Sequence, residues 1–372
     1  MLLTVTAALS LAVWVYLLAA RGGFWRLRPD PFTGVAAHDA PAVTAVIPAR
    51  NEADVVGRSL GSLAAQRYDG KFGIVLVDDA SDDGTADVAR AAAPDVRVVV
   101  AGPLPQGWTG KMWAVSEGVR HADAEYLLLT DADIVHPPDH VAELVARARA
   151  GDYDLVSYMV RLSCRTLAEQ ALIPAFVFFF FQLYPPAWIR DPRRKTAGAA
   201  GGCILIRREA LERIGGIARI AGELIDDCAL ARAVKGSGGR VWLGLSGEAY
   251  SIREYATFGE IGRMVSRTAY TQLQYSPLLL AGTVLGLVLT YLVPPVLTLA
   301  APPGAARGLG ALAWLLMTLC YLPAVRYGER PWYWAALLPA IAVFYLGATL
   351  YSAVAHWRGR GGMWKGRAHS AA

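Results

Sequence analysis

The chain has 372 residues, of which 55% are hydrophobic and 18% are charged, and a formal net charge of +5. It is therefore more apolar and less charged than an ordinary soluble domain. A basic chain can bind nucleic acid, but here the basic residues flank apolar segments rather than forming a stripe with aromatic side chains, which argues against that class of protein. The four cysteines show no metal-type spacing.

The first apolar segment lies at the N-terminus. Residues 2–20 carry no charge, and about 20 apolar residues span a bilayer as a helix. A cleaved signal peptide has basic residues before its apolar run, whereas Arg21, Arg26 and Arg28 follow this one. We therefore expect a permanent transmembrane anchor over residues 1–22, with the next residues in the cytoplasm because positive charges stay on that side.

The middle of the chain alternates short β-branched runs with helical patterns. Strands are expected at 43–48, 72–79, 96–102 and 125–131, and helices at 52–66, 82–93 and 111–122. Strands that alternate with helices predict a mostly parallel sheet with helices on both faces. The near-continuous apolar strands fit such burial, so the predicted fold class is α/β.

Polar side chains follow three of these strands. The first ends in PARNE (48–52), the second in DDASDDGT (78–85) and the fourth in DAD (131–133). Ligands of such sheets bind outside the carboxyl ends of the strands, so we expect these clusters along one edge. Asp82 and Asp83 are expected to serve mainly as a helix N-cap. No glycine-rich phosphate-binding motif is present, but the other carboxylates can hold a Mg²⁺ or Mn²⁺ ion that neutralises a pyrophosphate.

The motifs VIPARNE, VDDASDDGT, TDAD and IDDCAL occur in this order over residues 43–270. In this they resemble the family 2 glycosyltransferases, which have the GT-A fold. The chain is most similar to the hopene-associated membrane glycosyltransferases, with ceramide glucosyltransferase-like enzymes as more distant relatives. This further resemblance rests on the N-terminal anchor, the stretch GPLPQGWTGKMWAVSEG, a phenylalanine-rich insert and the motif WKGR. The resemblance implies a cytosolic GT-A domain over residues 40–270, with a Rossmann-like, mostly parallel sheet.

The resemblance also implies a donor site at the strand ends. A nucleotide-sugar, expected to be a UDP-sugar, would contact Pro48, Arg50, Glu52, Asp79 and Lys111. Asp131 would approach the ribose and the metal, and Asp133 would ligate the metal, so Mg²⁺ or Mn²⁺ is the expected cofactor. The alternative for Glu52 is a first-turn acid favoured by the helix dipole, and the alternative for Lys111 is a solvated lysine.

The acceptor side of the family has the pattern Glu-Asp-x-x-Leu, in which the Asp is the base. Here Asp226 replaces the Glu, and Asp227 aligns with the base. By resemblance, Asp227 takes the proton of an acceptor hydroxyl, which displaces the diphosphate in one inverting step; a helix cap is the alternative. Gly201 and Gly202 would allow close approach beside the donor sugar and acceptor, or form a plain turn.

Processive family members carry Gln-x-x-Arg-Trp after the base. Residues 264–268, MVSRT, keep only the arginine, Arg267, which is expected to bind the diphosphate. The missing Gln and Trp argue against a polysaccharide synthase. We therefore expect a single hexosyl or N-acetylhexosaminyl transfer.

A second apolar segment, residues 171–189, interrupts the predicted catalytic domain. Pro174, Gln182 and the prolines at 185–186 break it, and a crossing here would put the two halves of the site on opposite sides of the bilayer. We expect an interfacial segment whose aromatic side chains lie among the lipid headgroups; a buried core helix is the alternative.

Residues 277–355 contain three further apolar segments, 277–301, 309–325 and 332–355, expected to be transmembrane. A basic tail, 356–372, follows. Three spans that start in the cytoplasm would leave this tail outside, against the charge rule. The number of C-terminal spans and the side of the C-terminus therefore stay open.

Together the residues and the resemblance imply a multi-pass enzyme of a bacterial-type cytoplasmic (inner) membrane, with its catalytic domain facing the cytoplasm. It would move one sugar to a hydroxyl of a lipid acceptor in the bilayer, hopanoid-like by resemblance. A transferase to polyprenyl phosphate is an alternative and needs no base, because that acceptor is already anionic. A sugar-phosphate nucleotidyltransferase needs a glycine-rich loop that PARNEADVVGRS lacks. A non-catalytic scaffold would need none of Asp131, Asp133 and Asp227.

Overall fold

The structure is a computed structural model that describes residues 1–30, 40–359, 363–364 and 367–368. Much of the predicted basic tail therefore lies outside the described residues. The chain divides into two compact units, which are treated separately below. One is helical and comprises residues 1–28, 164–187 and 254–362, and the other is an α/β unit of residues 29–163, 188–253 and 363–372.

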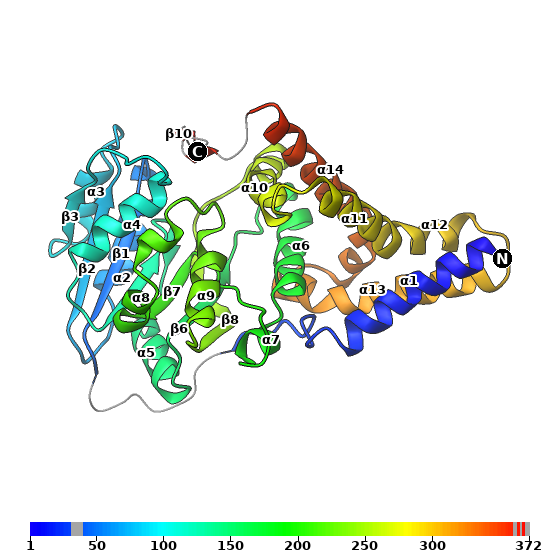
Figure 1. The fold of residues 1–372 in the computed structure, drawn as a ribbon, viewed down its shortest axis with the longest axis horizontal. Helices are drawn as coiled ribbons and strands as arrows, with labels where there is room; N and C mark the ends of the chain where they lie inside the picture. The colour runs from blue at the N-terminus through cyan, green and yellow to red at the C-terminus, as the bar shows by residue number, and fades with distance from the viewer. Residues whose placement is uncertain (31–39, 360–362, 365–366, 369–372) are drawn as a thin grey trace. The chain divides into compact units, whose positions relative to one another are not determined.

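The α/β unit contains an eight-stranded sheet of order β3-β2-β1-β4-β7-β6-β8-β5 (Figure 1). The strands are β1 Val43–Ala49, β2 Phe72–Asp78, β3 Arg97–Val100, β4 Tyr126–Thr130, β5 Ile134–Val135, β6 Leu155–Arg161, β7 Cys203–Arg207 and β8 Val241–Ser251. The four strands predicted from sequence are β1 to β4, and they form one parallel half in which β1 lies between β2 and β4. In the other half β7 runs antiparallel to both β4 and β6, so the sheet is mixed.

Helices cover both faces of the parallel half, as predicted. They are α2 Ala53–Ala64, α3 Thr85–Ala92, α4 Gly110–Arg120 and α5 His140–Ala150. Alternate residues of β1, including Ala45 and Ile47, join a core cluster with residues of α2, α3 and α5, while Val75 and Val77 of β2 pack with α4 on the opposite face. This two-sided burial explains why the strands read as continuous apolar runs.

The approach of α4 to the sheet depends on a glycine. A Cβ at Gly118 would lie 2.4 Å from Cγ1 of Val46 and 3.0 Å from Cγ2 of Val77. Close contact at this point fixes the height of α4 over the strands, and with it the position of its first turn at the carboxyl edge of the sheet. The unit also contains α8 Arg208–Arg213, the 3₁₀ turn η1 Ile217–Ile220, α9 Asp226–Gly236 and the two-residue strands β9 Met363–Trp364 and β10 Arg367–Ala368.

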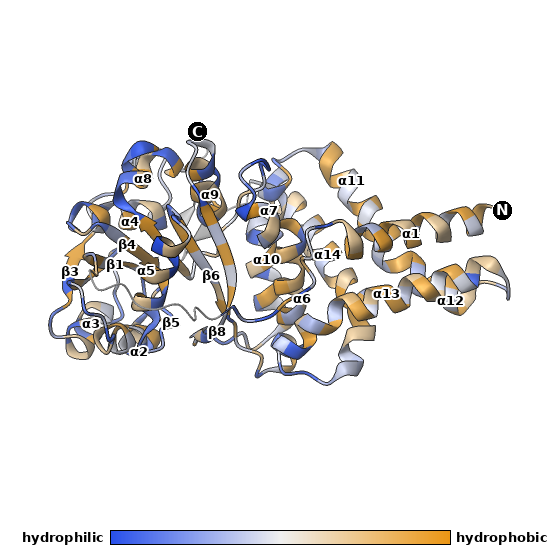
Figure 2. Ribbon diagram, turned by 90° about the horizontal axis from the view of Figure 1, so that it is seen from below, coloured by the Kyte–Doolittle hydropathy of each residue, from blue (hydrophilic) through white to orange (hydrophobic). Residues whose placement is uncertain are grey.

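The described residues contain five stretches that are long and apolar enough to cross a membrane, and all of them lie in the helical unit except residues 188–190 at the end of the second. They are Leu2–Ala19, Leu167–Arg190, Pro277–Ala300, Ala305–Tyr327 and Trp332–Trp357. The corresponding elements are α1 Leu2–Ala19, α6 Leu167–Leu183, α7 Pro186–Arg190, α11 Pro277–Leu287, the π-helical turn η2 Val288–Leu292, α12 Val293–Ala300, α13 Ala305–Tyr327, η3 Trp332–Leu337 and α14 Leu338–Trp357. Figure 2 shows α1, α13 and α14 coloured mostly as hydrophobic. The chain thus has the helices of a membrane protein.

Two hydrogen bonds join polar side chains of this unit to other helices of the unit. The indole of Trp14 donates to the carbonyl of Thr290 at 2.7 Å, and the hydroxyl of Tyr291 donates to the amide oxygen of Gln182 at 2.7 Å. Pro174 does not break α6, which runs through it, whereas the helix ends before Pro185. The remaining helix of the unit is the amphipathic α10 Phe258–Gln272, which carries Arg267.

Candidate active site

The loops that follow β1 and β2 are tied together by hydrogen bonds. The backbone N–H of Asn51 donates to Oγ of Ser81 at 3.0 Å, and the N–H of Glu52 donates to Oγ1 of Thr85 at 2.9 Å. The carboxylate of Asp83 accepts from the N–H of Ala53 and from the N–H of Thr85. Asp83 therefore serves local structure at two helix starts, but the N-cap of α3 is Gly84 rather than the predicted Asp82 or Asp83.

Arg50 and Asp79 meet between these two loops. The Arg50 guanidinium donates to the carbonyl of Asp79 and lies 3.8 Å from its carboxylate. Asp79 is 1% exposed, so the ion pair is shielded from water. These two predicted nucleotide-binding residues are thus brought together at the carboxyl edge of β1 and β2.

A second arginine, Arg253, which the sequence analysis did not single out, connects two other predicted residues. Nη2 of Arg253 lies 2.6 Å from the carboxylate of Glu52, and Nε of Arg253 lies 3.3 Å from Oδ2 of Asp133. The hydroxyl of Ser251 donates to the same oxygen of Asp133 at 2.6 Å. Asp133 is buried and bound on this side by an arginine and a serine of the β8 end. A search for arginine two residues beyond a strand end is the signal that could have pointed to it.

The densest charged cluster surrounds Lys111 in the first turn of α4. Its ammonium nitrogen lies 3.0 Å from Oδ1 of Asp131 and 3.1 Å from Oδ2 of Asp226. The side chain of Thr109 caps this helix by accepting from the N–H of Met112, which fixes the direction in which α4 begins. Residues from α4, the end of β4 and the start of α9 thus converge, although 115 positions separate Lys111 from Asp226.

Asp227 lies beside this cluster and is held by the backbone. Its Oδ2 accepts from the N–H of Gly201 at 2.9 Å, and its Oδ1 accepts from the N–H of Cys228 at 2.7 Å. Two backbone donors fix the direction of a carboxylate firmly. A Cβ at Gly201 would lie 3.4 Å from Oδ2 of Asp227 and 3.5 Å from Nζ of Lys111, so the glycine leaves open the space between these two groups.

These groups line an open cavity with an empty volume of about 350 Å³. Lys111, Asp131, Asp226 and Asp227 supply its charged side chains, and Pro48 and Gly201 also line it. The cavity lining does not include Arg50, Glu52, Asp79, Asp133 or Gly202. Gly202 instead faces the core, where a Cβ would lie 3.2 Å from Val160 and 3.3 Å from Ile134. The predicted site is therefore split into a cavity and two buried ion-pair groups on the same α/β unit.

The charges in the cavity shift one another's protonation. Burial and the neighbouring charge of Asp226 raise the pKa of Asp227 to about 6, against the opposing effects of Lys111 and the two backbone N–H groups. Burial raises the pKa of Asp131, with Lys111 opposing and Asp133 and Asp226 adding to the rise. Burial would lower the pKa of Lys111, but the charges of the aspartates outweigh it and raise that pKa, so the lysine stays protonated.

The donor set of the cavity fits a divalent cation. Three carboxyl groups and one ammonium group meet there. Carboxylate oxygens are the hard ligands that Mg²⁺ and Mn²⁺ prefer, and the ammonium between Asp131 and Asp226 shows that the two carboxylates converge on one cationic position. Asp131 and Asp226 fit this role on the cavity side, whereas Oδ2 of Asp133 is bound to Ser251 and Arg253.

Arg267 belongs to the other unit of the chain. It lies on α10 in the helical unit, outside the α/β unit that contains the cavity. Its proposed contact with the diphosphate stays a prediction.

Comparison with known proteins finds similarity in the fold and in part of the sequence. Residues 44–215 match the family model described as "Glycosyl transferase family 2". The solved structure of the mannosyltransferase PcManGT from Pyrobaculum calidifontis, in complex with GDP-Man and Mn²⁺, is 22% identical and aligns with a TM-score of 0.52. That alignment covers 92% of this chain and 99% of the neighbour. The likeness concerns the fold, which is the predicted GT-A fold with helices added at both ends.

Curated relatives match over a shorter region. The undecaprenyl-phosphate 4-deoxy-4-formamido-L-arabinose transferase of Shewanella sediminis is 35% identical over 121 residues, which is 32% of this chain and 36% of that protein. The protein of the same name from Edwardsiella ictaluri is 38% identical over 118 residues, covering 31% of this chain and 35% of the relative. The match therefore spans about a third of the length of each relative.

Proposed function

We propose that the chain transfers one sugar from a nucleoside diphosphate-sugar to a lipid acceptor at a membrane, because residues 44–215 match the model of glycosyl transferase family 2. The observation that carries this proposal is the cavity in which a protonated lysine and a positioned carboxylate face each other across Gly201. One group suits the leaving diphosphate and the other suits the attacking acceptor. The fold neighbour was solved with GDP-Man and Mn²⁺, which supports a nucleotide-sugar as donor.

Asp227 is the proposed general base. Its pKa of about 6 keeps it mostly ionised at neutral pH, while leaving it more basic than an ordinary aspartate. It takes the proton of an acceptor hydroxyl, the hydroxyl oxygen forms a bond to the anomeric carbon, and the bond from that carbon to the diphosphate breaks. Attack from the side opposite the leaving group inverts the configuration at the anomeric carbon.

Lys111 is the proposed partner of the leaving group. Its charge is held in place by Asp131 and Asp226, so it stabilises negative charge on the departing diphosphate without reorganising. A Mg²⁺ or Mn²⁺ ion held by Asp131 and Asp226, with Asp133 as the further predicted ligand, would supply additional charge neutralisation when bound. Pro48, Arg50, Glu52 and Asp79 remain the proposed nucleotide contacts, and Arg267 remains a proposed diphosphate contact.

The acceptor class has two candidates. A lipid hydroxyl, hopanoid-like by the sequence resemblance, is favoured by Asp227, because a hydroxyl needs a base. Polyprenyl phosphate is favoured by the names of the relatives, which are undecaprenyl-phosphate transferases, and it needs no base. Those relatives match over only about a third of their own length, which is too little to carry their acceptor over to this chain. We therefore propose the hydroxyl acceptor.

Localisation follows from the same proposal. The four candidate spans other than Leu167–Arg190 would hold the enzyme in the inner membrane with the α/β unit in the cytoplasm, where nucleotide-sugars are made. Residues 171–189 are proposed to lie at the membrane interface, on the aromatic side chains of α6. A UDP-sugar is the proposed donor on the sequence resemblance alone.

One experiment tests the function. Membranes containing the protein are incubated with a panel of labelled nucleotide-sugars and Mg²⁺ or Mn²⁺, and labelled lipids are identified by mass spectrometry before and after mild acid. A glycoside of a lipid alcohol survives mild acid, whereas a glycosyl phosphate is cleaved. An acid-stable labelled lipid supports the proposal, an acid-labile one replaces the acceptor by polyprenyl phosphate, and no labelled lipid with any donor contradicts lipid glycosylation.

A further inference from the structure

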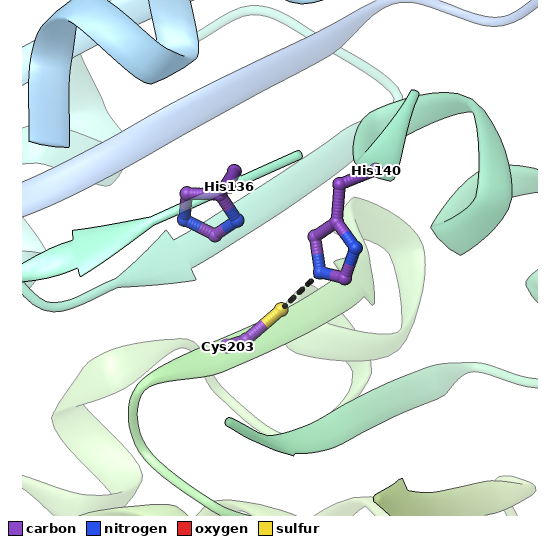
Figure 3. A group of neighbouring side chains, drawn as sticks. All are labelled: His136, His140 and Cys203. Carbon is purple, nitrogen blue, oxygen red and sulfur yellow. Dashed lines mark hydrogen bonds between the residues drawn. The ribbon is translucent and has the colours of Figure 1, made fainter. Parts of the chain in front are cut away.

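A second group of metal-ligating side chains lies behind the cavity and is not used by the proposed mechanism. His136 follows β5, His140 begins α5 and Cys203 begins β7. Each offers one ligand atom, and these atoms all lie within 4.8 Å of one another. All three side chains are buried, with exposed fractions of 2%, 2% and 0%. Figure 3 shows the two rings and the thiol gathered around one point, with the sulfur directed at His140.

Hydrogen bonds fix the tautomer of His136. The hydroxyl of Thr130 donates to the carbonyl of Gly202 at 2.8 Å, so its proton is already committed. Nε2 of His136 lies 3.0 Å from the same hydroxyl oxygen and must donate to it. Nδ1 of His136 is therefore a bare lone pair, and it is buried without a hydrogen-bond partner among the described residues. Burying a lone pair with no donor costs free energy. A metal ion bound to Nδ1 would remove that cost.

His140 and Cys203 complete the set. Nε2 of His140 lies 3.4 Å from Sγ of Cys203, and Nδ1 of His140 lies 3.9 Å from the carboxylate of Glu143. This distance is longer than a hydrogen bond, although a carboxylate near the far nitrogen is the kind of outer group that metal-bound histidines have. Burial keeps both rings neutral, lowering the pKa of His140 to about 4 and, with the neighbouring His140, lowering the pKa of His136 well below its usual range. Neutral imidazole is the form that binds metals.

We propose that His136, His140 and Cys203 bind one thiophilic metal ion, Cu⁺ or Zn²⁺, as a structural site. Thiolate and imidazole are the ligands that such ions select. The S–H bond of Cys203 breaks as the sulfur–metal bond forms, and the proton leaves to solvent. Cu⁺ with one thiolate gives a neutral complex that suits a buried three-ligand position, whereas Zn²⁺ leaves a charge of +1 and prefers a fourth ligand. We therefore expect Cu⁺ to be retained more tightly.

A metal at this site would hold in place two segments that line the cavity. Thr130 lines the cavity and also holds His136, while Gly202 accepts from Thr130 and is followed directly by Cys203. Asp131 and Gly201 are the adjacent residues on these two segments. A metal that joins β7 to the start of α5 would therefore fix the backbone that positions a cavity carboxylate and the donor to Asp227.

The test measures metal rather than activity. Protein purified through a tag without histidine is loaded with Cu⁺ or Zn²⁺ under reducing conditions, freed of unbound metal and analysed for metal content. We expect about one ion per chain in the unchanged protein and in the control Cys228→Ser, which alters another buried cysteine of the same unit. Cys203→Ser and His140→Gln should lose the ion. Equal metal in Cys203→Ser and the unchanged protein would overturn the proposal.

A second measurement keeps the test decisive if these variants fail to fold. X-ray absorption of the loaded, unchanged protein should show one sulfur at about 2.3 Å and two nitrogens at about 2.0 Å when the ion is zinc. A zinc environment of oxygen and nitrogen alone, or a chain that retains neither ion, would overturn the proposal.

Discussion

The pKa of Asp227 depends on the charge of Asp226, and this dependence can be measured. The pKa of Asp227 lies at about 6 rather than 3.8, with burial the larger cause and the charge of Asp226 the next. Two unit charges about 6 Å apart interact by about 3 kcal/mol at an effective dielectric constant of 20, or roughly 2 pKa units. Because burial dominates the rise, we expect the substitution Asp226→Asn to lower the pKa of Asp227 by about one unit.

The assay is the pH profile of kcat/KM for sugar transfer. Since the base must be ionised, activity should fall below about pH 6 in the unchanged enzyme. In Asp226→Asn this acidic limb should move to lower pH, whatever happens to the maximum rate. Asp226→Glu keeps the charge and should leave the limb in place.

Two results would refute this reasoning. If kcat/KM fell at the same acidic pH in the unchanged enzyme, Asp226→Asn and Asp226→Glu, a group other than Asp227 would be titrating, for instance the phosphate of a polyprenyl phosphate acceptor. The absence of an acidic limb would mean that no carboxylate with a raised pKa is needed for transfer.

Further predictions concern stability, the cavity and the metal. Gly118→Ala should destabilise the protein by about 1–3 kcal/mol, because the new methyl group would lie 2.4 Å from Val46. Gly61→Ala, whose methyl group would meet nothing within 4 Å, should be neutral or stabilising by up to about 1 kcal/mol. Thermal unfolding in detergent compares the two variants, and equal stability would contradict the close packing of α4 on the sheet. Gly201→Ala should keep the fold but lower kcat, because its methyl group would fill the space between Asp227 and Lys111. Gly202→Ala should lower the unfolding temperature instead, and the reverse pattern would contradict the roles given to the two glycines. Chelation by EDTA should abolish donor binding, measured by calorimetry, and Mn²⁺ should restore it; unchanged binding in EDTA would remove the divalent ion from the donor site.

The sequence predicts the parallel half of the sheet well, because buried strands and amphipathic helices have local periodicities. Their carboxyl ends then follow from topology, so the clusters at 48–52, 78–85 and 131–133 could be expected along one edge before the fold was known, whereas Lys111 came from the resemblance. The resemblance added Asp227, which no local pattern separates from an ordinary helix cap. The structure puts it beside Lys111 and binds it to Gly201.

What the sequence did not predict depends on contacts between distant residues. The antiparallel strand β7 enters the sheet beside β4, and no pattern in CILIR states its direction. Arg253 joins Glu52 to Asp133 from 201 positions away along the chain, so Asp133 is paired where a free metal ligand was expected. Cys203 meets His140 across 63 positions, which is why spacing alone gave no metal motif.

The central claim is that Asp227 activates a lipid hydroxyl for attack on a bound nucleotide-sugar. The most direct measurement compares donor binding and lipid glycosylation in Asp227→Asn, with the exposed Asp95→Asn as control. We predict that Asp227→Asn binds the labelled donor as the unchanged protein does but forms little or no labelled lipid, while Asp95→Asn keeps both properties. Undiminished transfer by Asp227→Asn would contradict the claim.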